Sequence, residues 1–93
     1  MILFDKYDPS KAKENQEKHE GVTFEEGETV LYDNDALTII DNESDPNEER
    51  PVSTGMSAIG LILVVVYTYR GERIRMISSR KAKPHERKAY SNQ

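Results

Sequence analysis

The 93-residue chain contains no cysteine, so it can form neither disulfide bridges nor thiolate metal sites. Its stability must therefore come from packing or from a partner subunit. Long apolar runs are also missing: the longest, LILVVVY at residues 61–67, is far shorter than the roughly 20 residues that cross a bilayer. The N-terminal MILFDKYD lacks the charged and apolar regions of a signal peptide. We expect a cytoplasmic protein without membrane association.

Positive charge is scarce in the first half of the chain, although the formal net charge of the whole is only -4. Residues 1–49 hold 4 Lys and no Arg against 15 Asp and Glu, a net charge of -11. Residues 50–93 hold 9 Lys and Arg against 2 Glu, a net charge of +7. Such an asymmetry indicates either a surface that binds a polyanion or a partner that neutralises one half.

Two helices are predicted in the first third of the chain. The first covers residues 9–19, because Asp8 can cap its free amides and KAKENQEKH consists of good helix formers. The second covers about residues 24–32 and begins with a capping box at Thr23. Gly27 weakens the second helix and indicates close contact with a neighbouring element. The inward face of the first helix is unusually polar, and consists of Ala12, Asn15, Gln16 and His19.

Strand patterns dominate the rest of the chain. ALTIID and RPVSTGMS read as strands on either side of an exposed acidic loop, DNESDPNEE at 41–49. GLILVVVYTY is apolar on both faces, as a central strand requires, and Gly71 indicates a hairpin to the next strand. Simple alternation in that last strand places Ile74, Met76 and Ser78 on one face, and Arg73, Arg75, Ile77 and Ser79 on the other.

The order of these elements predicts the fold class. MILF is short enough to be only an edge strand, and a helix is predicted to begin near Pro84. We expect one α+β domain over residues 1–93, with a short N-terminal strand and two helices, then a four-stranded antiparallel sheet and a C-terminal helix.

The basic end, IRMISSRKAKPHERKAY, is the clearest functional signal. Arg75 and its neighbours present forked donors that suit phosphate oxygens, and Tyr67, Tyr69 and Tyr90 are available for base stacking, so RNA is the ligand that we expect. The alternative is an ordinary solvated strand face with half-buried tyrosines. Two histidines far apart and no cysteine match no metal-ligand spacing, and we expect no metal and no cofactor. No glycine-rich phosphate loop or serine nucleophile motif occurs.

Several linked motifs resemble the BrnT toxin family. YDPSKAKENQEKHEGVTFEE is similar to its N-terminal signature, and ERPVSTGMS, LILVVVYTYRGERIRMISSRKA and HERKAY follow in the family's order, from about Phe4 to Tyr90. The resemblance implies a ribonuclease toxin of a bacterial type II toxin–antitoxin system, with a fold similar to the RelE and ParE toxins, that cleaves RNA and inhibits translation. It also implies a BrnA-like ribbon-helix-helix antitoxin in a 2:2 complex, with operator DNA contacted only through that antitoxin.

The resemblance further implies a metal-independent endoribonuclease, in which the 2′-hydroxyl of the RNA attacks and the protein supplies a base, an acid and cations. In this reading Arg75 and Arg80 stabilise the phosphate, while His19, Glu86 or Tyr90 transfers protons. The residues expected to bind RNA are Lys18, Arg50, Arg73, Lys81, Lys83, Arg87 and Lys88.

Three positions depart from the family pattern. Tyr7 stands where Trp is frequent, Gly27 stands where Ala is common, and Glu20 is inserted between His19 and Gly21. The inserted Glu20 can shift His19, so a catalytically inactive member that binds antitoxin or RNA is the alternative function. A plain RNA-binding protein that only holds the backbone is a third reading.

Overall fold

The computed structural model describes residues 1–41 and 47–93, so part of the predicted acidic loop at 41–49 lies outside the described residues. The strands are β1 (Leu3–Phe4), β2 (Leu37–Asp41), β3 (Arg50–Met56), β4 (Ile62–Arg70) and β5 (Arg73–Lys81). The helices are α1 (Pro9–Lys18), α2 (Phe24–Val30) and α3 (Pro84–Ser91). The predicted α+β class and element order are confirmed, and both N-terminal helices end one or two residues earlier than expected.

The described strands form one five-stranded mixed sheet in the order β1-β5-β4-β3-β2. The expected four-stranded antiparallel sheet is therefore only partly right, because β1 joins it as a fifth strand and pairs in parallel with β5. The pairing of Leu3 with Arg73 joins segments that lie far apart in the sequence. A pattern of local periodicity carries no information about such a distant partner.

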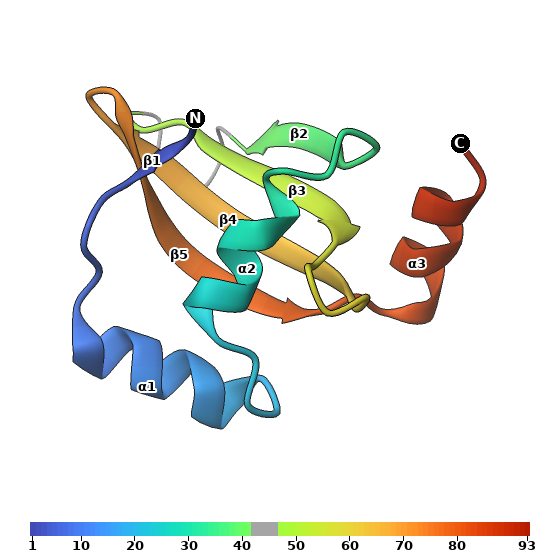
Figure 1. The fold of residues 1–93 in the computed structure, drawn as a ribbon, viewed down its shortest axis with the longest axis horizontal. Helices are drawn as coiled ribbons and strands as arrows, with labels where there is room; N and C mark the ends of the chain where they lie inside the picture. Colours follow the sequence, from blue (N-terminus) through green and yellow to red (C-terminus); the bar gives the residue numbers. More distant parts are fainter. Residues whose placement is uncertain (42–46) are drawn as a thin grey trace.

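The core lies between the sheet and α2, which crosses β4 and β5 (Figure 1). Side chains from α2 and its entry meet side chains from the two central strands, and the cluster comprises Val22, Phe24, Val30, Leu63, Val65, Tyr67 and Met76. Burying a side chain such as Leu63 or Val65 stabilises the fold by roughly 1.5–3 kcal/mol. The predicted close contact at Gly27 is confirmed, because a Cβ there would lie 2.4 Å from Ser79 Oγ.

Helix α1 lies beside β5, and of the residues expected on its polar inward face Asn15 is buried, whereas Gln16 is exposed, so that prediction is only partly right. Asp8 caps the helix by accepting from the Ser10 amide, as expected. Asn15 is buried and donates to the carbonyls of Val22 and Ser79 at 3.0 and 2.9 Å, while its side-chain oxygen accepts from the Ser79 amide at 3.1 Å. The Asn15 side chain thus supplies the hydrogen bonds that a neighbouring strand would supply at the edge of β5.

A β-bulge changes the faces of β5. Tyr67 pairs with Met76 and Val66 pairs with Ser78, so Ile77 is an extra residue in the register. Beyond the bulge the simple alternation predicted for this strand is therefore wrong: Ser79 shares the face of Met76, and both contact Gly27. Arg75 pairs with Thr68 and Arg80 with Val64, so the two arginines share the opposite face despite their odd separation.

Candidate active site

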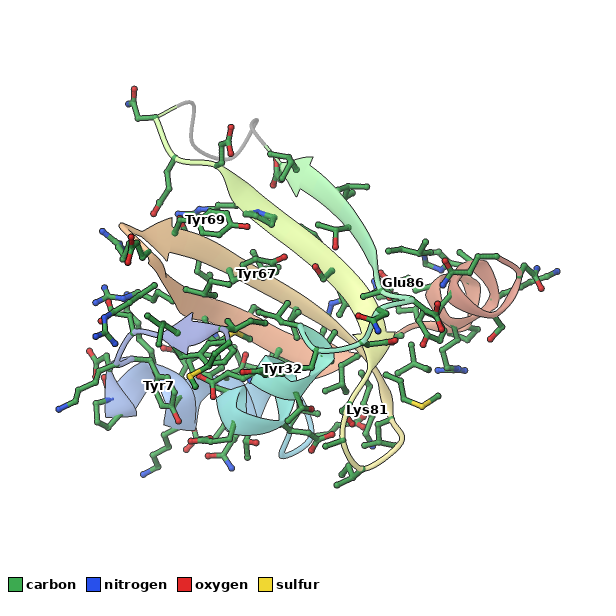
Figure 2. The ribbon with its side chains drawn as sticks, turned by 45° about the horizontal axis from the view of Figure 1, so that its top comes forward. Tyr7, Tyr32, Tyr67, Tyr69, Lys81 and Glu86 are labelled. Atoms are coloured by element: carbon green, nitrogen blue, oxygen red, sulfur yellow. The ribbon has the colours of Figure 1, made fainter. Side chains whose placement is uncertain are left out.

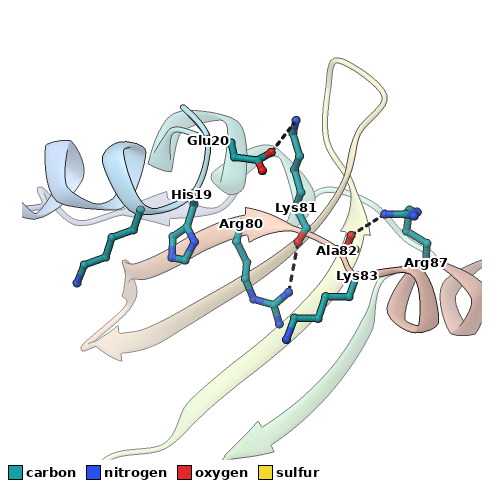
Figure 3. A pocket seen from close by; sticks show the side chains of 8 residues that line it. His19, Glu20, Arg80, Lys81, Ala82, Lys83 and Arg87 are labelled. Carbon is teal, nitrogen blue, oxygen red and sulfur yellow. Dashed lines mark hydrogen bonds and ion pairs between the residues drawn. The ribbon is translucent and has the colours of Figure 1, made fainter.

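A cleft opens where the end of α1, the end of β5 and the start of α3 meet (Figure 3). Its volume is about 350 Å³. Most of its side chains carry positive charge, and its lining consists of Lys18, His19, Glu20, Arg80, Lys81, Ala82, Lys83 and Arg87. The fold thus brings together six residues that the sequence marked for catalysis or RNA binding, from segments about sixty residues apart.

Arg80 is oriented by a carboxylate from the first turn of α3. Its two terminal nitrogens donate to the two oxygens of Glu86 at 2.8 and 2.9 Å, and Glu86 also accepts from the Lys83 amide at 2.7 Å. This Arg80 partner lowers the pKa of Glu86 to about 2, and Glu86 in turn raises the pKa of Arg80. Glu86 is therefore an anion at neutral pH and holds no proton to donate to a leaving group.

His19 is the C-cap of α1, and its backbone amide donates to the Asn15 carbonyl at 2.9 Å. The side chain is partly exposed and lines the same cleft as Arg80 (Figure 3). An imidazole can both accept and donate a proton near neutral pH. Asn15 helps to position both His19 and Arg80, because it joins the end of α1 to β5 just before Arg80.

Glu20 is the only non-glycine residue with positive φ in the described chain, at 55°. With Gly21 at φ 83° it turns the chain sharply after α1. Glu20 thus forms part of the turn, and His19 is the helix cap. The Glu20 carboxylate lies 3.4 Å from Lys81 Nζ at the rim of the cleft, where it offsets one positive charge.

The remaining cationic residues of the cleft are held in different ways. The Arg87 guanidinium donates to the Ala82 carbonyl at 2.7 Å, and Lys18 pairs with Glu14 at 2.8 Å on the surface of α1. Lys83 is the N-cap of α3, directly before Pro84 at the first helical position. A phosphate in the cleft would meet cations from three separate elements.

Several residues expected in the site lie elsewhere. Tyr90 donates to Asp33 at 2.6 Å, and this contact raises the pKa of Tyr90 to about 12. Arg75 pairs with Asp5 at 3.0 Å, and Arg50 lies 3.5 Å from Glu48. Both arginines line a different cavity from the cleft. The two other expected RNA-binding residues, Arg73 at the β4–β5 hairpin and Lys88 on α3, are exposed.

The tyrosines considered for base stacking are also distant from the cleft. Tyr67 is buried, and its hydroxyl is within 2.9 Å of Ser53 Oγ, so its ring is a core residue. Tyr69 is exposed but lies toward the hairpin end of the sheet, far from Lys81 and Glu86 at the other end (Figure 2). The alternative reading of Tyr67 as a strand residue agrees with this burial.

Two residues that line the cleft's neighbouring hollows were not singled out from the sequence. Lys11 lines hollows next to the cleft, and its spacing of seven from Lys18 places both on one face of α1, a signal that was available. Arg70 lines the cavity that contains Arg50 and Arg75, and only the strand register shows this neighbourhood.

Within residues 1–41 and 47–93, no group of three or more His, Asp or Glu side chains is placed to hold a metal ion. In that same part of the chain, no helix is both long and apolar enough to span a bilayer. What the cleft offers chemically is one imidazole beside a cluster of cations, an arrangement that can bind a phosphodiester and move a proton.

A family model described as "Ribonuclease toxin, BrnT, of type II toxin-antitoxin system" matches residues 7–86. The comparison with curated proteins found no match. The matched residues include His19, Arg80 and Glu86, and they end shortly before Tyr90.

Proposed function

Because the chain belongs to the BrnT family of ribonuclease toxins of type II toxin–antitoxin systems, we propose that the cleft between α1, β5 and α3 cleaves RNA and thereby inhibits translation. One observation carries this proposal: His19 and Arg80 line a single cavity together with Lys18, Lys81, Lys83 and Arg87. A site that stabilises a phosphorane needs such a concentration of cations, and a proton-transfer group must lie within reach.

The proposed reaction uses the 2′-hydroxyl of the substrate as nucleophile. His19 removes the proton of this hydroxyl while the 2′-oxygen forms a bond to phosphorus. The bond between phosphorus and the 5′-oxygen breaks, and the leaving oxygen takes a proton from water in the open cleft. The products are a 2′,3′-cyclic phosphate and a free 5′-hydroxyl. Arg80 offsets the charge that develops on the phosphorane, so the protein supplies the positive charge without a metal ion.

In this mechanism Glu86 and Tyr90 have supporting roles. Glu86 is already deprotonated and engaged with Arg80, which suits it to orient the guanidinium. Tyr90 donates to Asp33 outside the cleft and attaches α3 to the rest of the domain. Of the three residues first considered for proton transfer, His19 is the one that lines the cleft.

A type II system implies a protein antitoxin as partner. We propose that this partner is a BrnA-like ribbon-helix-helix protein, that the two form a 2:2 complex in the bacterial cytoplasm, and that operator DNA is bound through the antitoxin alone. We also propose that the fold is similar to that of the RelE and ParE toxins. Neutralisation requires the antitoxin to cover the cleft or to displace α3, which carries Glu86 and Arg87.

The test is cleavage of end-labelled RNA by the purified chain in the presence of EDTA. We expect the wild type to yield fragments with 2′,3′-cyclic phosphate ends, and His19→Gln to be at least about 100-fold slower. Arg80→Lys keeps the charge but loses the forked donors, and should also cleave at least about 100-fold more slowly. Lys13→Gln, a substitution at an exposed residue of α1 outside the cleft, should cleave like the wild type. Intact RNA with folded wild type would refute the cleavage proposal.

The geometry at Glu20 and Arg80 supports a second candidate, a family member that binds without cleaving. Glu20 offsets Lys81 at the rim, and both terminal nitrogens of Arg80 are occupied by Glu86. A phosphate would have to compete with Glu86 for the guanidinium. Binding of RNA or antitoxin by the wild type without any decay of RNA would favour this candidate.

A further inference from the structure

Two further hollows adjoin the cleft along α1 and β5. A second hollow of about 310 Å³ is lined by Lys11, Glu14, Asn15, Lys18, His19, Ile77 and Ser78. It shares Lys18 and His19 with the cleft. It also shares Lys11 and Ile77 with a third hollow, of about 290 Å³, that lies toward β1. Because neighbouring hollows share lining side chains, the three lie in a row along α1 and β5, and we call this row the groove.

The far end of this groove is a pocket with three arginines, Arg50, Arg70 and Arg75, which we call the arginine pocket. Glu48 lies 3.5 Å from Arg50 and 3.7 Å from Arg70, and Asp5 lies 3.0 Å from Arg75. Asp8 and Lys11 line the same pocket, so four cationic side chains face three carboxylates there. The positive excess is smaller than that of the cleft, and all three arginines belong to strands.

Two of the three arginines have a side-chain donor without a hydrogen-bond partner. Among the described residues the Nε atoms of Arg50 and Arg75 are buried and have no hydrogen-bond partner. Buried donors of this kind are rare in native proteins and call for an explanation. The three side chains stay 33%, 52% and 42% exposed, so an anion can reach them from the groove. A phosphate oxygen that reaches the Nε atoms after the guanidinium groups rotate would satisfy donors that the protein leaves unused.

The β5 bulge brings arginines from both ends of the groove onto one face of the strand. It places Arg75 and Arg80 on the same face of the strand, whereas strict alternation would place them on opposite faces. Five residues of strand separate them by roughly 16 Å. One polyanion that follows the groove can therefore contact both arginines.

We propose that this groove binds single-stranded RNA, and that the arginine pocket holds backbone phosphates of the substrate several nucleotides away from the cleaved bond. A cationic groove that follows the backbone is how proteins bind single strands without reading a sequence. The inference rests on the proposed function, because the strand in the groove is the substrate of the cleft. An acidic segment of a protein partner is the competing occupant, but the continuity with the cleft favours RNA.

The test uses the full chain carrying His19→Ala, so that RNA stays intact during the measurement. Fluorescence anisotropy compares a single strand of about 12 nucleotides with a dinucleotide that can fill only the cleft. Lys11→Gln and Arg70→Gln each remove one exposed charge from the groove. Lys13→Gln is the matched control, because Lys13 is exposed on the same helix α1 and is not among the residues that line the three hollows.

We expect Lys11→Gln and Arg70→Gln each to weaken binding of the long strand about 5- to 10-fold. Each should also reduce the slope of log K against log salt by about 0.7, the contribution of one phosphate contact. Binding of the dinucleotide should not change, and Lys13→Gln should bind the long strand like the parent. Circular dichroism and thermal unfolding confirm that each variant is folded.

The inference is overturned if the two groove variants bind the long strand as the Lys13→Gln control does, or if they lose antitoxin binding and keep RNA binding. RNA cleavage by the chain with His19 intact decides the proposed function separately. Cleavage by the wild type with unaffected groove variants would leave the proposed function standing without this groove. Loss of long-strand binding in the groove variants, with no cleavage by the wild type, would support the groove alone.

Discussion

Asn15 shows how one polar residue can hold two elements together. Its three hydrogen bonds run to Val22 and to both backbone groups of Ser79, from a side chain that is almost fully buried. We predict that Asn15→Ala lowers the free energy of unfolding by about 3 kcal/mol, because buried backbone groups lose their partners. Urea denaturation measures the loss. Gln16→Ala, an exposed neighbour on α1, should cost less than about 0.5 kcal/mol, and equal effects would contradict the role of Asn15.

Glu86 leads to a prediction about pH at the same scale. Its pKa is lowered to about 2 in the folded protein, chiefly by Arg80, from an ordinary value of 4.5. A lowered pKa stabilises the fold above the ordinary value, and this contribution disappears as the pH falls toward the lowered one. The stability difference between wild type and Glu86→Gln should therefore be largest above pH 4.5 and shrink toward pH 2. Urea denaturation across this range measures it, and a constant difference would argue against the Arg80–Glu86 pair as its source.

At the scale of elements, the distance between α2 and the sheet depends on a glycine. A Cβ at position 27 would lie 2.9 Å from Ser79 Cβ and 3.0 Å from Met76 Cε. Although Ala favours a helix over Gly by about 1 kcal/mol, we predict that Gly27→Ala destabilises the domain by about 1–2 kcal/mol through overpacking. Thermal and urea unfolding measure this. The same substitution in a Ser79→Gly chain should cost less, and an equal cost in both chains would refute the contact.

Helix α3 is held mainly by polar contacts, and none of its described residues, Pro84–Ser91, is buried. The Tyr90 hydroxyl, which donates to Asp33, joins the last turn of this helix to the chain after α2. We predict that Tyr90→Phe weakens the docking of α3 by about 1 kcal/mol. Hydrogen exchange should become faster in α3 and stay unchanged in β4. Tyr69→Phe, at an exposed tyrosine, is the control. Destabilisation of the whole domain by Tyr90→Phe would contradict a contact that holds α3 alone.

At the scale of the whole molecule, the fold separates charges that the net value of -4 conceals. Lys11 and Lys18 come from the acidic half, yet they join the basic residues of β5 and α3 along one groove. We predict that RNA affinity falls steeply with salt, with a log–log slope of about -2 to -3, as expected for three or four phosphate contacts. Anisotropy titrations at several NaCl concentrations measure the slope.

The charge control for this prediction is a pair of glutamates. Glu20→Gln removes a carboxylate from the rim of the cleft and should raise RNA affinity about two- to threefold. Glu17→Gln removes the same charge from an exposed position on α1 and should have a smaller effect. Salt-independent binding, or equal effects of the two substitutions, would show that the field of the cleft does not govern association.

Much of the fold could be predicted because it depends on neighbouring residues. The cap at Asp8, the helix that begins at Pro84 and the hairpin at Gly71 are local features, and all three are observed. The parallel pairing of β1 with β5 and the bulge at Ile77 were not predicted, since both depend on distant partners. The grouping of His19 with Arg80 was expected from the family resemblance, but the assignment of Arg75 to a separate pocket required the register.

The sequence by itself determined the class of the domain, the position of most elements and the concentration of cations toward the C-terminus, because helix caps, periodicity and charge are read over short spans. Only the tertiary structure decided which cations share a surface. The bulge set the face of Arg80, Asn15 joined α1 to β5, and Glu86 oriented the guanidinium, each through contacts that no local pattern records. Long-range contacts are chosen by the packing of the whole chain, and the groove that we propose for RNA is a product of that packing.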